Sequence, residues 1–210
     1  TNNYSAIFLL VDKNTQKYCL PHFLDKIKVL RDKPVISIEA GEVNKQLETC
    51  KQVWNQLSEL GADRKSLLIN LGGGVLTDLG GFVAAAFKRG IHFINIPTTL
   101  LSMVDASVGG KTGVDFQGLK NQIGIITNPE LVLIDSIYLK TLPENEYRSG
   151  FSEMLKHGII SDAEFFKRLS KYQFFEKNDI SHLIHHSVSI KNSVVTGDPL
   201  EKNLRKILNF

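Results

Sequence analysis

The sequence predicts an α/β fold that continues into an all-helical portion. Apolar runs of strand length alternate with helical patterns as far as residue 143, and glycine and proline are rare from Glu144 until Gly197-Asp198-Pro199. Strands that are apolar throughout are typical of a mostly parallel sheet with helices on both faces. We therefore expect an α/β domain over residues 1–143 and the first, incomplete part of an all-helical domain over residues 144–210.

Five apolar runs predict the strands of this sheet. They are bounded by polar residues, glycine or proline, which commonly end strands. The runs are Ser5–Val11, Val35–Glu39, Ser66–Leu71, Ile91–Ile96 and Leu131–Asp135.

Two clear helical patterns lie between these strands. The first covers Val43–Leu60, and the second covers about Thr77–Lys88, with Gly90 as its expected C-terminal stop. In the first helix the apolar residues recur on one face. They are Leu47, Val53, Trp54, Leu57 and Leu60. Leu142-Pro143-Glu144 is interpreted as the hinge that leads to the helical portion.

The composition excludes several classes of protein. The chain has 25 Lys and Arg residues against 22 Asp and Glu residues, and its net charge of +3 is too small to indicate a nucleic-acid binder. No apolar run approaches the roughly 20 residues that span a bilayer. Two cysteines, Cys19 and Cys50, make no disulfide framework and are expected to be packed, and no secretory leader opens the sequence. We expect a cytoplasmic protein without a nucleic-acid or membrane partner.

A glycine cluster, Gly72-Gly73-Gly74, follows the third strand and opens a helix. Such a helix N-terminus attracts anions, because its free N–H groups carry partial positive charge. The dinucleotide-binding fingerprint requires a further glycine where Thr77 stands, and an acid about 20 residues later, near Ile94 and Asn95. Both are absent. The fingerprint is rejected, and a tight structural turn and an anion site both remain open.

The motif Gly109-Gly110-Lys111-Thr112 imitates the end of an NTPase phosphate-binding loop. That loop needs a glycine where Asp105 stands, and an aspartate there would repel a triphosphate. The motif therefore does not predict a nucleotide hydrolase.

Several charged residues and histidines share helical spacings. Glu153 and Lys156 lie three apart on one helix face, and taken alone such a pair is typical of a solvated surface. Glu153 and His157 have a spacing that suits two metal ligands, but two ligands make no closed site. A further group of three histidines favours an exposed polar helix face over a metal site. These are His182, His185 and His186.

Three long segments resemble a known family. They are GGGVLTDLGGFVAAAFKRG, INIPTTLLSMVDASVGGKTGVDFQGLKNQIG and LIDSIYLKTLPENEYRSGFSEMLKHG. Together they resemble the 3-dehydroquinate synthase family, from about Asp12 to Phe210 without an obvious gap. The resemblance covers the family's NAD-binding domain and only the beginning of its helical domain.

The resemblance implies a lyase of the shikimate route that uses NAD and a divalent metal, Zn²⁺ or Co²⁺. Its substrate is 3-deoxy-D-arabino-heptulosonate 7-phosphate, and its products are 3-dehydroquinate and phosphate. NAD⁺ oxidises a ring hydroxyl, phosphate is eliminated, the hydride is returned, and the opened ring closes by an aldol step. The hydride chemistry belongs to the nicotinamide, and the protein supplies position and charge.

The resemblance also implies roles for individual residues. Those expected to contact the substrate are Lys111, Asn121, Lys156, Lys191, Arg205 and Asn209, with Asp105 beside substrate and cofactor. Those expected to bind NAD are Asp12, Asn14, Glu42, Lys45, Gly73, Gly74, Asp78, Thr98, Thr99, Lys120, Thr141 and Leu142. Glu153 matches a zinc ligand. Arg89 matches an arginine that reaches the substrate phosphate of the neighbouring subunit, which implies a homodimer.

The sequence departs from the family pattern at three points. Thr77 stands where glycine is frequent and is able to cap the following helix. His157 stands where other residues are commoner. The family's two histidine zinc ligands lie beyond Phe210, so the 210 residues alone are expected to be inactive and metal-free, because one glutamate cannot hold catalytic zinc.

Two other functions remain open at this point. One is a different sugar-phosphate cyclase of the same superfamily, and the other is a non-catalytic NAD-binding module. NAD-dependent polyol dehydrogenases of the same fold are disfavoured, because they do not need the phosphate-binding set around Lys111 and Asn121.

Overall fold

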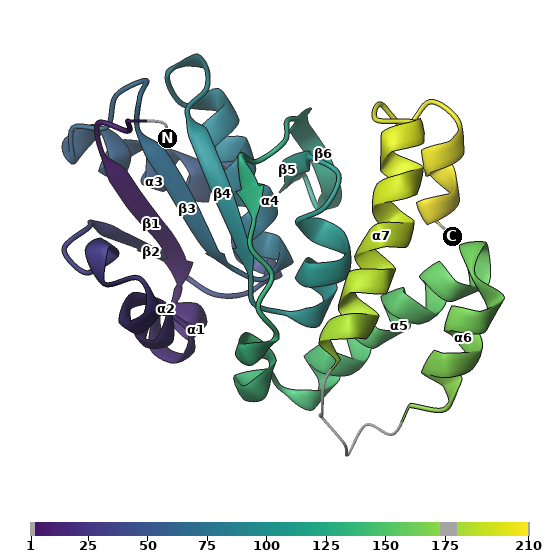
Figure 1. The fold of residues 1–210 in the computed structure, drawn as a ribbon. Helices are drawn as coiled ribbons and strands as arrows, with labels where there is room; N and C mark the ends of the chain where they lie inside the picture. Colours follow the sequence, from purple (N-terminus) through teal and green to yellow (C-terminus); the bar gives the residue numbers. More distant parts are fainter. Residues whose placement is uncertain (1–2, 173–179, 210) are drawn as a thin grey trace.

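A parallel sheet forms the centre of the first part of the chain (Figure 1). The structure, a computed structural model, describes residues 3–172 and 180–209. The sheet has five strands in the order β2-β1-β3-β4-β7, and every neighbouring pair is parallel. The strands are β1 (Ile7–Asp12), β2 (Val35–Ile38), β3 (Leu67–Gly72), β4 (His92–Pro97) and β7 (Leu131–Val132). All five predicted strands are present.

The last strand is shorter than predicted. The apolar run Leu131–Asp135 gives only the two residues of β7. After it, Asp135 accepts a hydrogen bond from the backbone N–H of Ile137 and caps a 3-10 helix, η5 (Ser136–Thr141). This cap turns the chain away from the sheet edge, so the strand cannot continue.

Both faces of the sheet are buried, as the continuous apolar runs predicted. One face packs on α1 (Lys13–Tyr18), α2 (Leu20–Lys26) and the helical part of the chain, and its core residues include Leu9, Val11, Leu67, Ile69 and Leu71. The other face packs on α3 (Leu47–Glu59) and α4 (Gly74–Ala86), and its core residues include Phe8, Leu10, Ile36, Ile38 and Leu68. Because strand side chains alternate in direction, one uninterrupted apolar strand supplies both cores.

The bounds of the two predicted helices need correction. α3 begins at Leu47 rather than Val43, because Glu42–Asn44 forms a separate 3-10 turn, η2, in which Val43 is 82% exposed. Leu60 lies beyond the end of α3 and is exposed, so it does not join the apolar face.

α4 begins at Gly74, one turn earlier than predicted. Its N-cap residue is Gly73, and Thr77 lies buried inside the helix. The Thr77 hydroxyl donates to the carbonyl of Gly74 at 3.2 Å. Thr77 therefore does not cap the helix, because its position one turn into α4 directs the hydroxyl back to a helix carbonyl. The chain leaves α4 through the 3-10 turn η3 (Phe87–Arg89), and Gly90 follows with φ +112°.

An antiparallel hairpin lies beside α4 and was not predicted (Figure 1). It consists of β5 (Lys111–Phe116) and β6 (Leu119–Ile126), joined through Gln117 and Gly118, which both have positive φ. β6 is largely exposed, so its sequence lacks the apolar run on which the strand predictions depended. Its strand formation is decided by pairing with β5.

The helical part starts at Glu144. It contains α5 (Glu144–Ser161), α6 (Ala163–Ser170), α7 (Ser181–Gly197) and the 3-10 helix η6 (Leu204–Asn209). α5 touches the loop after β4 at Gly150, where an added Cβ would lie 2.6 Å from the carbonyl carbon of Leu100. A larger residue at this position would force the two parts of the chain apart. Within the described ranges, no helix has both the length and the apolar content needed to cross a bilayer.

Candidate functional site

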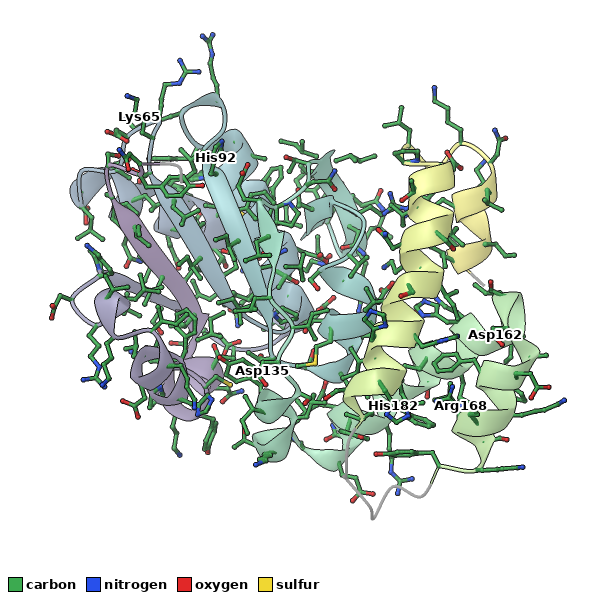
Figure 2. The ribbon with its side chains drawn as sticks, viewed as in Figure 1. Lys65, His92, Asp135, Asp162, Arg168 and His182 are labelled. Carbon is green, nitrogen blue, oxygen red and sulfur yellow. The ribbon has the colours of Figure 1, made fainter. Side chains whose placement is uncertain are left out.

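The loops that follow the parallel strands gather at one edge of the sheet. Lys65 and His92, at the starts of β3 and β4, lie at one end of the sheet, and Asp135, after β7, lies at the other (Figure 2). The strand order changes direction between β1 and β3. In open parallel sheets, ligands bind at the carboxyl edge beside such a reversal.

The glycine turn at this edge is held tightly by its neighbours. An added Cβ on Gly73 would lie 3.0 Å from Cγ2 of Thr99, and one on Gly74 would lie 3.2 Å from Cβ of Ala106. Close packing therefore accounts for both glycines without a ligand, while the α4 N-terminus still presents its amides at this edge. The structural turn and the anion site, which the sequence left open, are compatible.

A buried lysine that follows η2, Lys45, connects α4 with the hairpin. Nζ of Lys45 lies 2.6 Å from Oδ2 of Asp78 and 2.6 Å from Oδ1 of Asn121 on β6. The Lys45 residue is only 4% exposed. Burial raises the pKa of Asp78 to about 6, although the nearby Lys45 opposes that shift. Three predicted site residues thus form a single charged network between the glycine turn and the hairpin.

A second buried pair joins the two parts of the chain. The segment after β4 forms a π-helix, η4 (Ser102–Ala106), a conformation frequent at functional sites. Nζ of Lys191 on α7 donates to the backbone carbonyl of Asp105 at 2.6 Å and also to the Asp105 carboxylate. Burial alone would raise the pKa of Asp105, but Lys191, aided by Lys156 and His157, holds it below its usual range. Burial lowers the pKa of Lys191, although Asp105 opposes this.

Between α4, the hairpin, α7 and η6 lies a cavity of about 570 Å³. Seven of the predicted site residues line it: Asp78, Asp105, Lys111, Asn121, Lys191, Arg205 and Asn209. Arg205 is 2% exposed and donates to the carbonyls of Pro199 and Gly109, at 2.8 and 2.7 Å. These two bonds fix the guanidinium and leave three of its five N–H groups for other partners.

A carboxylate of the chain itself occupies part of this cavity. Oε2 of Glu201 lies 2.5 Å from Nζ of Lys111, and Oε1 accepts from the side-chain amide of Asn209 at 2.9 Å. The hydrogen bond from Lys111 lowers the pKa of Glu201. Lys111 and Asn209 are thus arranged to hold two oxygens of one anionic group. Glu201 was not predicted from the sequence, because a glutamate in an irregular segment carries no local signal.

Glu153, Lys156 and His157 meet beside the cavity. Nζ of Lys156 lies 2.6 Å from Oε1 of Glu153 and donates to the carbonyl of Leu208 at 2.7 Å. The two charged side chains are 17% and 14% exposed, so the solvated pair expected from spacing alone is wrong. α5 packs this face against α7 and η4, and η6 adds the carbonyl of Leu208.

The donor set around Glu153 suits a metal ion. Ligating atoms of Asp105, Glu153 and His157 lie within 4.8 Å of one another. Nε2 of His157 is buried without a hydrogen bond among the described residues, and buried Oε1 of Glu153 has only the ion pair with Lys156. Carboxylate oxygen and imidazole nitrogen are ligands that Zn²⁺ and Co²⁺ accept. The residues present therefore fit part of a metal site.

Other predicted residues lie outside the cavity. Lys120 on the hairpin pairs with Glu42 at 3.0 Å, which brings together two residues expected at NAD. Arg89 is exposed and lines a neighbouring hollow of about 400 Å³, which shares Ile125 and Ile126 with the cavity. The remaining expected NAD residues lie at or beyond the ends of β1, β4 and η5. These are Asp12, Asn14, Thr98, Thr99, Thr141 and Leu142.

The three histidines of α7 form no metal site with one another. His182 and His185 are exposed, and His182 lies at the start of α7 (Figure 2). Nε2 of His186 lies 2.8 Å from the carboxylate of Asp162, the N-cap residue of α6. The predicted exposed polar face is confirmed for His182 and His185, whereas His186 is half-buried in its pair with Asp162. Both cysteines are buried and free, as expected, and burial raises the pKa of Cys19 to about 11 and of Cys50 to about 12.

The fold and the cavity together define a class of protein. It is an α/β protein with a parallel sheet whose carboxyl-edge loops face a helical part, and with buried cations between the two parts. Two family models match the chain: one described as 3-dehydroquinate synthase N-terminal, over residues 35–149, and one described as 3-dehydroquinate synthase C-terminal, over residues 150–210. The chain belongs to the 3-dehydroquinate synthase family.

Individual relatives agree with this assignment. A 3-dehydroquinate synthase of Parabacteroides distasonis is 45% identical over 99% of this chain, and one of Acetivibrio thermocellus is 43% identical over 96%. The chain spans 59% and 58% of the lengths of these relatives. A solved structure of 2-epi-5-epi-valiolone synthase ValA from Streptomyces hygroscopicus subsp. jinggangensis, with NAD⁺ and Zn²⁺ bound, is similar with a TM-score of 0.89 at 29% identity. That similarity covers 99% of this chain and 60% of ValA.

Proposed function

We propose that the full-length protein containing this chain converts 3-deoxy-D-arabino-heptulosonate 7-phosphate to 3-dehydroquinate and phosphate. Family membership supports this reaction, and so do relatives named 3-dehydroquinate synthase at 43% identity and above. The same similarity disfavours a non-catalytic NAD-binding module and a cyclase for another sugar phosphate. The 210 residues alone are proposed to give no turnover.

The observation that carries the proposal is that Lys111 and Asn209 both bind the Glu201 carboxylate, Lys111 by an ion pair and Asn209 by a hydrogen bond. A substrate with a phosphate and a carboxylate needs fixed cations and N–H donors, and charge-assisted hydrogen bonds are the strong ones. The substrate's anionic group takes the place of Glu201 in this proposal. Lys111 and Arg205 then orient the phosphate, while Asp105, fixed by Lys191, lies beside the reacting carbons.

NAD is proposed to bind along the carboxyl edge of the sheet. Glu42 can accept two hydrogen bonds from the adenosine ribose diol, and the turn at Gly73 and Gly74 lets the pyrophosphate approach the α4 N-terminus. When bound, the nicotinamide removes a hydride from the substrate and later returns it. The structure of ValA with NAD⁺ supports this cofactor.

Glu153 is proposed to hold a divalent metal ion, Zn²⁺ or Co²⁺. The buried carboxylate of Glu153, in a cluster with Asp105 and His157, supports this, together with the Zn²⁺ of ValA. As a Lewis acid, such an ion polarises the hydroxyl that is oxidised and the ketone that results. The ion pair with Lys156 holds the Glu153 carboxylate in position.

Further proposals concern the assembly. We propose a homodimer in which Arg89 reaches the neighbouring subunit's phosphate site, which its exposure in a separate hollow supports. We retain residue 143 as the end of the NAD-binding domain, because the helical part begins with α5 at Glu144. A reducing cytoplasm is proposed from the two free, buried cysteines.

Phosphate release tests the proposed reaction. The full-length protein, supplied with NAD and Co²⁺, is expected to release phosphate from 3-deoxy-D-arabino-heptulosonate 7-phosphate and to form 3-dehydroquinate, identified by mass spectrometry. Turnover of a different sugar phosphate, with none of this one, would overturn the substrate assignment.

A further inference from the structure

His157 has a buried ring nitrogen that forms no hydrogen bond within the part of the chain that the structure describes. The side chain is fully buried on α5, and its Nδ1 lies 2.7 Å from Oγ of Ser187, which is fully buried on α7. On the opposite side of the ring, Nε2 lies 3.4 Å from Oε1 of Glu153. Oε1 has Lys156 as its ion-pair partner, but Nε2 has no hydrogen-bond partner among the described residues. Buried polar atoms normally have one, so the position of this nitrogen requires a reason.

The two neighbours of the ring determine which nitrogen carries the proton. A carboxylate only accepts hydrogen bonds, so the nitrogen that faces Glu153 is the N–H donor when no ion is present. Nδ1 is then the acceptor, and the Ser187 hydroxyl is the donor that reaches it. Ser187, His157 and Glu153 thus form one directed series, from α7 through the ring to the carboxylate.

We propose that His157 is a positioning residue for the metal-binding carboxylate of Glu153, a role that rests on the proposed function. Oε1 is held from one side by Lys156 at 2.6 Å and from the other by His157, which leaves Oε2 for the ion. A small rotation of Glu153 brings 3.4 Å to the roughly 2.7–2.9 Å of a charge-assisted bond. Ser187 keeps the imidazole in the tautomer that this bond needs.

Direct ligation by His157 is the competing role, and it has different requirements. It needs a lone pair on Nε2, and hence a proton on Nδ1 that is donated to Ser187. The conservative replacement by glutamine separates the two roles. The amide nitrogen of glutamine can donate to Glu153 as Nε2–H does. Its carbonyl oxygen could ligate an ion only after the amide turns over, and the exchange of a nitrogen ligand for an oxygen ligand would then change the Co²⁺ spectrum.

The test is a Co²⁺ titration of the full-length protein, followed by its visible absorption, which reports coordination geometry. His157→Phe removes the donor and is expected to weaken Co²⁺ binding about 10–100-fold, the usual effect of losing a partner that orients a ligand. The shape of the Co²⁺ spectrum is expected to stay unchanged. His157→Gln is expected to restore most of the affinity, and Ser187→Ala to cause a smaller loss than His157→Phe. His185→Gln, an exposed position on α7, is the matched control and is expected to leave affinity unchanged.

Each other outcome decides against the proposal. Equal losses in His157→Gln and His157→Phe, or an altered spectrum in either, would assign direct ligation. Unchanged affinity in His157→Phe would remove His157 from the site, and unchanged affinity in Ser187→Ala would remove Ser187. If His157→Phe does not fold, the glutamine and alanine variants give the answer. A wild-type protein that binds no Co²⁺ would refute the proposed metal dependence itself, which is a separate result.

Discussion

Replacing Lys45 by methionine should destabilise the protein at pH 8 and have little effect at pH 5. Methionine keeps most of the side-chain length and removes the charge that lies 2.6 Å from Asp78. At that distance, with an effective dielectric constant near 20, the attraction is about 6 kcal/mol. Part of this lost attraction is offset, because the variant no longer bears the free-energy cost of burying the Lys45 ammonium. The net loss expected for removing one partner of a buried pair is about 3–5 kcal/mol.

The pH dependence follows from the raised pKa of Asp78. Its pKa is about 6 in the folded chain against the ordinary 3.8, so the folded state binds this proton more tightly than the unfolded state does. The contribution of Asp78 to stability is therefore fully present below pH 3.8 and is lost as the pH rises through 6. Without Lys45 the pKa rises further, and at pH 5 the carboxyl group is neutral with or without the lysine.

The assay is urea unfolding of wild type and Lys45→Met at pH 5 and pH 8, followed by circular dichroism. We expect a loss of about 3 kcal/mol at pH 8, the lower end of that range, and less than about 1 kcal/mol at pH 5. The two pH units between the pKa of Asp78 and pH 8 are worth at most about 2.7 kcal/mol. A second replacement, Asp78→Asn, should recover much of the loss at pH 8, since it removes the unpaired charge. Lys65→Met, at an exposed position away from this network, is the control. An equal loss at both pH values would refute the role assigned to the Asp78 charge.

Three further changes test the site and its support. Lys111→Ala in the full-length protein should cost about 2–4 kcal/mol of transition-state stabilisation, measured as kcat/KM, and unchanged turnover would remove Lys111 from the site. Asn95→Ala takes away the acceptor, at 2.9 Å, of the buried Asn70 amide, and should lower the free energy of unfolding by about 1–3 kcal/mol in urea. Gly150→Ala forces a Cβ against the backbone of Leu100 and should cost about 1–3 kcal/mol, seen as a lower Tm; an unchanged Tm would contradict the close contact.

The alternation of apolar runs and helical patterns was enough to predict the sheet. All five strands were found from short segments, because a strand buried on both faces is apolar throughout and this property is local. The apolar-run criterion did not predict the hairpin Lys111–Ile126, because its second strand is largely exposed and has no such run. The same criterion predicted a strand over Leu131–Asp135 that is longer than β7. The apolar run continues beyond Val132, but the chain turns into η5, which Asp135 caps.

The candidate site divides in the same way. The glycine turn at Gly73 and Gly74 was visible as a motif, and the family resemblance supplied seven of the residues that line the cavity, including every charged one except Glu201. Neither indicated that Glu201 fills the position between Lys111 and Asn209. The surface pair expected from the spacing of Glu153 and Lys156 was wrong, because spacing gives a shared helix face but does not tell what covers that face.

The sequence by itself determined the element types, the parallel α/β class and the family. The element types and the class depend on apolar patterns that are local in the sequence, and the family depends on three long motifs. Tertiary structure decided the charged network, because its partners are far apart along the chain: Lys45 and Asp78 by 33 positions, Asp105 and Lys191 by 86, and Gly109 and Arg205 by 96. Whether such groups meet depends on how the sheet, the hairpin and α7 pack, and burial then sets the strength of their interaction.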